Sequence, residues 1–192
     1  MRHSQADKVA CAAHRERQGK GARYDATSAP HEDLLLARRG TAFFARKMIE
    51  LSDTDLYGPS AIPSQSRAHV VVHISFVARR QALMLEALCN ADLRTIPEDQ
   101  EQHFADLDLA ATLPPRAIRH LFRHSEVHLN VCWRDLTDTQ WDMPLSQSDS
   151  SRVTPRQLPR LRAVQIWHAA VSLMNGANER ELPASLREES TV

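Results

Sequence analysis

The sequence predicts an all-α protein, a four-helix bundle whose helices are joined by long connections. Apolar residues recur at helical spacing in four segments, and strand-like alternation is scarce. Long segments rich in proline, serine or acidic residues separate these four. Of the 192 residues, 42% are hydrophobic and 25% are charged, which is enough apolar material for one packed domain.

The first two helices are expected before residue 90. Pro30 should open the first one with an acid-rich turn, and Gly40 should weaken it without ending it. Over 34–51 its apolar residues largely recur at helical spacing: Leu35, Leu36, Phe43, Phe44, Met48 and Leu51. After a linker over 52–66, Ser66 is a good N-cap for a second helix that ends near Leu88. One face of this helix carries Val70, His73, Phe76, Val77, Arg80 and Met84.

The other two helices each begin at a proline. Pro114 and Pro115 open the third helix, which ends near Trp133. Pro159 opens the fourth, which ends near Asn175–Gly176 and presents Leu161, Val164, His168 and Val171 on one face. The connections are 89–112, with a short helix around 99–109, and the loop 136–158. We expect a flexible extension over 1–30, one helical domain over 31–186, and a tail over 187–192.

Composition excludes several classes of protein. Lys and Arg total 24, as do Asp and Glu, so the basic surplus of a nucleic-acid-binding protein is missing. The longest mostly apolar stretch, 70–78, is too short to span a bilayer, and the N-terminus has no apolar core of a signal peptide. The three cysteines, Cys11, Cys89 and Cys132, form no CxxC motif. We therefore expect a cytoplasmic protein that binds neither nucleic acid nor membranes.

The ten histidines are the main candidates for chemistry. His69 and His73 are four residues apart, so they share a helical face, but two ligands do not close a metal site. His120, His124 and His128 form a stripe with roughly 6 Å between successive members. One straight helix cannot bring all three onto one ion, so solvated or hydrogen-bonded histidines are expected there.

Three segments carry a resemblance to a known family. LLLARRGTAFFARKMIELSDTDL, SRAHVVVHISFVARR and ATLPPRAIRHLFRHSEVHLNVCWRDL resemble the N-terminal domain of mycothiol-dependent maleylpyruvate isomerases. That domain belongs to the DinB-like four-helix superfamily. The resemblance runs from about Glu32 to Leu186 in matching order, and it implies the same bundle that the periodicity predicts.

The resemblance also implies a metal site. The family pattern has one histidine on the second helix, matched by His73, and a Glu-x-x-x-His pair on the fourth. In the register set by Arg162, Trp167, Asn175 and Gly176, that pair falls on Gln165 and Ala169. The implied zinc site is therefore degenerate. His168, one residue earlier, could substitute as a ligand if the helix rotated or carried a π-bulge.

The activity implied by the resemblance is thiol- and metal-dependent cis–trans isomerisation of maleylpyruvate to fumarylpyruvate. A mycothiol-like thiol would add to the conjugated double bond and leave again after rotation. Arg80, on the His73 face, could bind a substrate carboxylate. Family members usually continue into a second domain that contributes an arginine. The alternatives are a metal-free module that binds a small molecule or thiol, and an inactive paralogue.

Overall fold

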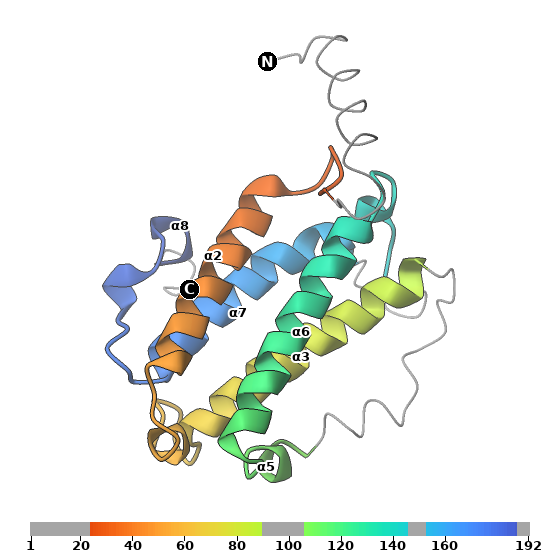
Figure 1. Cartoon of the computed structure of the whole chain (residues 1–192). Helices are drawn as coiled ribbons and strands as arrows, with labels where there is room; N and C mark the ends of the chain where they lie inside the picture. The colour runs from red at the N-terminus through yellow and green to blue at the C-terminus, as the bar shows by residue number, and fades with distance from the viewer. Residues whose placement is uncertain (1–23, 90–105, 146–152, 188–192) are drawn as a thin grey trace.

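Four long helices form a bundle, as the sequence predicts. The structure, a computed structural model, describes residues 24–89, 106–145 and 153–187. The long helices are α2 (His31–Ile49), α3 (Arg67–Cys89), α6 (Pro115–Asp135) and α7 (Leu158–Ser172) (Figure 1). Shorter elements are the 3₁₀ turns η1 (Asp55–Tyr57), η2 (Gln140–Asp142), η3 (Pro155–Gln157) and η4 (Glu179–Glu181), and the helices α5 (Leu107–Ala110) and α8 (Ala184–Arg187). The described residues contain no β-strand, only an isolated bridge.

The expected helix starts are confirmed. Pro30 precedes α2, whose first turn carries Glu32 and Asp33, so negative charge lies at the positive end of the helix dipole. Ser66 precedes α3, and its hydroxyl accepts the backbone N–H of His69 at 3.4 Å. Pro115 is the first residue of α6, where its missing N–H leaves no helical hydrogen bond unmade.

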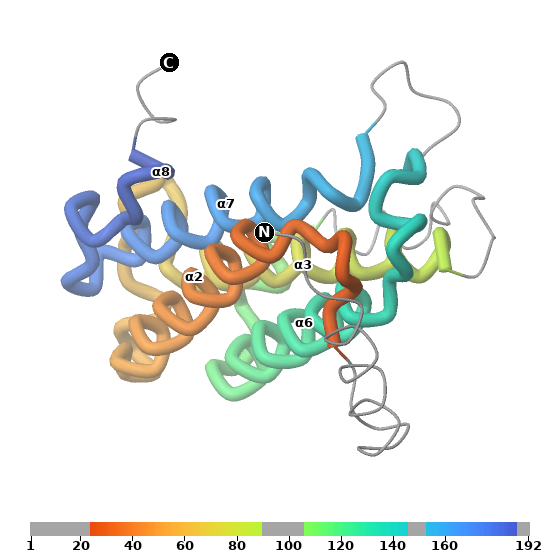
Figure 2. The backbone as a smooth tube through the Cα atoms, turned by 90° about the horizontal axis from the view of Figure 1, so that it is seen from above, coloured from red at the N-terminus to blue at the C-terminus, as the bar shows by residue number. Residues whose placement is uncertain are grey.

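The bundle packs its helices in two main pairs. Helix α2 lies along α7, and α3 lies along α6, with a further contact between α3 and α7 (Figures 1 and 2). The core between them is continuous and includes two fully buried residues on each of α2, α3 and α6, Leu34, Phe44, Ile74, Leu85, Ile118 and Leu129. Burial of this apolar surface is the main stabilising contribution to the fold.

Gly40 permits the close approach of α2 and α7. A Cβ at this position would lie 2.6 Å from Cγ2 of Ile166 and 2.8 Å from the indole of Trp167. The same indole stacks on Phe43, with ring centroids 4.9 Å apart, and donates to the carbonyl of Leu36 at 3.2 Å. A side chain at position 40 would therefore push α2 and α7 apart, so their close packing requires glycine there.

The faces that the sequence groups together on the second and fourth helices are only partly buried. Helix α3 buries Val70 but exposes His73 and Arg80, whereas Val71, Val72, Ile74, Ala78 and Ala82 line the core. Helix α7 exposes 48% of Leu161 and buries Arg162, Ala163, Ile166, Trp167 and Ala170. Both helices are apolar on most sides, so periodicity alone does not indicate which side faces the neighbours.

The first described residues are attached to the bundle. Asp25 forms a bidentate pair with Arg38, at 2.6 and 2.7 Å. Ser28 bonds to Asp138, and its carbonyl accepts from Arg156. Of the predicted extension over 1–30, residues 1–23 lie outside the described residues, as do 188–192 of the predicted tail and 90–105, where part of the short helix was expected. Every helix in the described part is too short or too polar to cross a lipid bilayer.

Candidate functional site

The two histidines of α3 have different surroundings. His69 is a structural residue: its Nδ1 lies 2.7 Å from the hydroxyl of Ser66, and its Nε2 lies 3.4 Å from a carboxylate oxygen of Asp108. His73, one turn later, has an exposed side chain. Partial desolvation, and the positive charge of Arg162, lower the pKa of His73 below its usual value. His73 is therefore neutral near pH 7, the state in which imidazole binds a metal or accepts a proton.

Beneath His73, a buried polar network joins the four long helices. Arg162 of α7 is fully buried and donates to the carbonyl of Ile74 on α3 at 2.9 Å. It also pairs with Glu126 on α6, whose other oxygen accepts from Thr41 on α2 at 3.2 Å. Burial raises the pKa of the Glu126 carboxyl, and Arg162 and Thr41 oppose that rise. The network fixes the helix register next to His73.

The other register residues of the fourth helix also have structural roles. The Asn175 side chain donates to the carbonyl of Lys47 at 2.9 Å, which ties the end of α7 to the end of α2. Gly176 follows with φ of 74°, the left-handed conformation that favours glycine after a helix. Together with Arg162 and Trp167, these residues place Gln165 at a defined position on α7.

The positions implied as metal ligands offer few donors. The Oε1 atom of Gln165 is buried and has no hydrogen-bond partner among the described residues. Most buried polar atoms in proteins have such a partner. Ala169 has no donor atom. A catalytic zinc site needs three protein ligands and an open position. His73 and Gln165 supply two neutral donors, so these positions do not fit a charged three-ligand site; a contribution from the half-buried His168 stays a prediction.

The histidine stripe on α6 has the predicted spacing. Ring centroids of His120 and His124, and of His124 and His128, lie 6.2 Å apart. The first two histidines line a shallow pocket of about 600 Å³, together with Arg79 and Arg116. The third is not merely solvated, because its Nε2 lies 2.7 Å from a carboxylate oxygen of Glu86.

One three-residue group among the described residues brings metal-binding atoms together, and it includes none of the sequence-predicted ligands. Glu86, His128 and Cys132 each offer one such atom, and these atoms all lie within 4.8 Å of one another. The i, i+4 spacing of His128 and Cys132 in HLNVC was a usable signal for this pair. Glu86, 42 residues before His128, had no such signal.

Arg80 is exposed on α3, seven residues beyond His73. That spacing is two helical turns, so both side chains leave the helix on about the same side. The structure thus places a basic residue where a ligand at His73 could extend along α3. Its role in binding a carboxylate stays a prediction.

Comparison with known proteins gives two kinds of match. Two crystal structures of the mycothiol-dependent maleylpyruvate isomerase, of the enzyme and of a mutant of it, are similar in fold, with TM-scores of 0.71 and 0.72 and 23% identity. Each match covers 82% of this chain and 65% of the other, so the chain spans about two thirds of that enzyme's length. No curated protein sequence matches significantly.

The family model for the mycothiol maleylpyruvate isomerase N-terminal domain matches residues 37–170. The matched range includes most of α2, all of α3 and α6, and most of α7, with His73, Gln165, His168 and Ala169. It is well over half of the chain. The chain therefore belongs to the mycothiol maleylpyruvate isomerase N-terminal domain family.

Proposed function

We propose that this protein is a maleylpyruvate isomerase-type enzyme that binds a low-molecular-weight thiol, such as mycothiol, and a small unsaturated acid. The observation that carries the proposal is the family match, which extends over all four long helices and includes His73. The solved isomerases of the same fold, named for their dependence on mycothiol, support the choice of thiol.

The proposed reaction is an addition followed by an elimination. A thiolate forms a C–S bond to the conjugated double bond of maleylpyruvate, and the π electrons move onto the adjacent carbonyl as an enolate. Rotation about the new single bond follows. The enolate then re-forms the double bond and expels the thiolate, giving the trans isomer, fumarylpyruvate. Atoms balance because the thiol is regenerated.

This chain's residues supply two roles in that scheme. His73 is exposed and neutral near pH 7, so its imidazole can accept the proton of the incoming thiol. Arg80 lies two turns along the same helix and can bind a substrate carboxylate with its planar guanidinium. We assign no step to a metal. Gln165 and Ala169 stand where the family has a glutamate and a histidine, so the site lacks a carboxylate and a second imidazole.

The experiment measures metal content and isomerase activity together. Protein is purified without chelators or a histidine tag, and zinc per chain is determined for wild type, His73→Ala and the control His124→Ala. Maleylpyruvate turnover is then followed with mycothiol and with glutathione. We expect thiol-dependent turnover that His73→Ala abolishes and His124→Ala retains. Turnover equal in His73→Ala and wild type, or none with either thiol, would contradict the proposal.

A variant that restores the family's ligand pair tests whether His73 belongs to a weakened form of the family's metal site. Gln165→Glu combined with Ala169→His re-creates the family's ligand pair on α7, one turn apart. If His73 lies at the family site, this double variant gains about one zinc per chain and higher turnover, and the gain disappears when His73→Ala is added. A double variant that gains no zinc beyond the wild-type amount, or whose added zinc persists when His73→Ala is introduced, would show that the ligand assignment is wrong.

A metal-free binding module is the second candidate. It is favoured by the pocket lined by Arg79, Arg116, His120 and His124, whose basic side chains suit an anionic ligand. Under this alternative, small dicarboxylic acids stabilise the protein against heat in the presence of a chelator. Arg116→Ala removes that stabilisation, and His73→Ala leaves it unchanged.

A further inference from the structure

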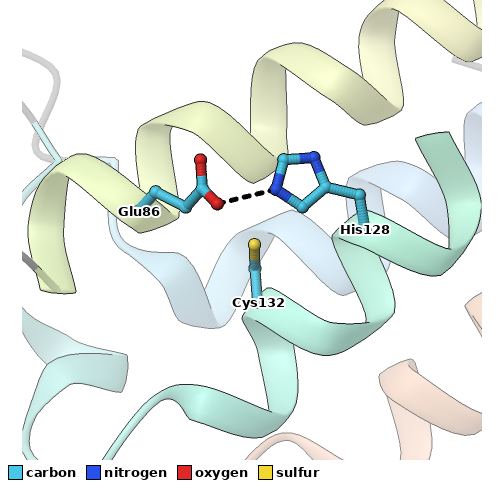
Figure 3. Close-up of side chains that lie close together, drawn as sticks. All are labelled: Glu86, His128 and Cys132. Carbon is cyan, nitrogen blue, oxygen red and sulfur yellow. Dashed lines mark hydrogen bonds and ion pairs between the residues drawn. The ribbon is translucent and has the colours of Figure 1, made fainter. Parts of the chain in front are cut away.

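Three potential ligand atoms converge between α3 and α6, away from the His73 position. Glu86 comes from α3, and His128 and Cys132 come from successive turns of α6 (Figure 3). Their side chains point toward a shared space, with Nε2 of His128 2.7 Å from Oε1 of Glu86. His73 and Glu86 are 13 residues apart on one helix, or about 20 Å along its axis, so the two positions are separate.

The donor set matches a borderline metal such as zinc. Zinc binds cysteine sulfur at about 2.3 Å and histidine nitrogen or carboxylate oxygen at about 2.0–2.2 Å, in a tetrahedron. The ligand atoms of such a tetrahedron lie about 3.3–3.8 Å apart. All three atoms are already within 4.8 Å of one another, so binding requires the 2.7 Å pair to open slightly and the thiol to approach.

The local charge also favours a cation. Burial, together with the negative charges of Glu86 and Asp135, raises the pKa of the Cys132 thiol to about 12. Partial desolvation and the same two carboxylates raise the pKa of Cys89, the last residue of α3. Two cysteines therefore experience the same negative potential. A thiolate, a carboxylate and a neutral imidazole together would balance the two charges of a zinc ion.

Access from solvent is available on one side. Cys132 is 5% exposed, whereas the side chains of His128 and Glu86 are 25% and 46% exposed. An ion could enter past the carboxylate and then rest against the buried sulfur. The three residues leave one tetrahedral position for water or for the neighbouring Cys89.

We propose that Glu86, His128 and Cys132 form a second, zinc-type metal site between α3 and α6, independent of the position implied for the family's metal. By tying two helices together at their packed ends, the ion would stabilise the bundle. The competing interpretation is a metal-free ion pair between Glu86 and His128 beside an inert buried thiol.

Cobalt distinguishes these interpretations because it reports sulfur ligation directly. The full chain, reduced and free of a histidine tag, is titrated with Co²⁺, and the thiolate-to-cobalt charge-transfer absorption is recorded. Zinc affinity is then measured by competition with a chromophoric chelator. The variants are Cys132→Ser, His128→Gln and Glu86→Gln, and the matched control is His124→Gln, one turn earlier in the same stripe and outside the trio.

We expect one ion per chain with charge-transfer absorption in wild type and His124→Gln. Loss of an outer-shell partner already costs about 10–100-fold in metal affinity, so each ligand variant should cost at least about 100-fold. Zinc should also raise the melting temperature of wild type and not of Cys132→Ser. If a variant of the buried Cys132 fails to fold, Glu86→Gln still tests the site, because the Glu86 side chain is partly exposed.

Three results would overturn the proposal. One is a wild-type protein without charge-transfer absorption. Another is zinc affinity that Cys132→Ser and Glu86→Gln leave unchanged. A third is affinity lost in His73→Ala and retained in all three ligand variants, which would place the ion at the His73 position.

Discussion

Charge removal at Glu126 should destabilise the protein strongly, because it leaves Arg162 charged and unpaired inside the bundle. Arg162 is fully buried, and it donates to the carboxylate of Glu126 and to the carbonyl of Ile74. The Glu126→Gln variant keeps the volume of the side chain and one acceptor oxygen. Removing one partner of a buried ion pair costs about 3–5 kcal/mol of unfolding free energy. For a domain of this size that corresponds to a melting temperature lower by about 6–20 °C.

The assay is urea unfolding followed by circular dichroism and tryptophan fluorescence, with both probes required to agree. A second variant, Glu126→Leu with Arg162→Met, removes both charges. Apolar replacement of a whole buried pair is often neutral or stabilising, so this double variant should be more stable than Glu126→Gln alone. Arg156→Gln is the surface control. It breaks a bidentate pair with Asp142 in which both side chains are over a third exposed, together with a hydrogen bond to the Ser28 carbonyl, and it should cost far less stability than Glu126→Gln.

Two results would refute this reasoning. The first is a Glu126→Gln variant that loses no more stability than Arg156→Gln. The second is a double variant no more stable than the single one. Either would mean that water or structural relaxation solvates Arg162 in place of Glu126, and that the network does not hold the four helices in register.

Three further changes test the packing, the electrostatics and a helix cap. Gly40→Ala should lower the unfolding free energy by about 1–2 kcal/mol, since overpacking against α7 exceeds the gain in helix propensity; a stabilised variant would contradict the close approach. Arg38 lowers the pKa of Asp25, so this carboxylate stabilises the fold above its unfolded pKa, near 4, and the contribution is lost as the pH falls through the lower folded value. Asp25→Asn should therefore be less stable than wild type at pH 7 and equal to it near pH 2, measured by urea unfolding; a constant difference would refute the assignment. Ser66→Ala should cost about 1 kcal/mol by removing the cap of α3, and no change in unfolding would show that the cap is not used.

Local chemistry made the helices predictable. Pro30, Ser66 and Pro115 mark starts that depend on each residue's own backbone or side chain, and the structure has them within a residue of the expected places. The 6 Å spacing of the α6 histidines follows from helix geometry alone, and it is confirmed. The family resemblance likewise depends on sequence order, which needs no coordinates.

The tertiary structure alone decided which side of each helix is buried and which side chains meet. Helix α3 reads VVVHISFVA, apolar on nearly every side, so only its neighbours α6 and α7 select the buried face and leave His73 exposed. The role of His69 depends on Asp108, and that of His128 on Glu86, each on another helix. Sequence patterns encode neighbours within a helical turn, whereas these contacts join residues about 40 apart that meet only when the helices pack.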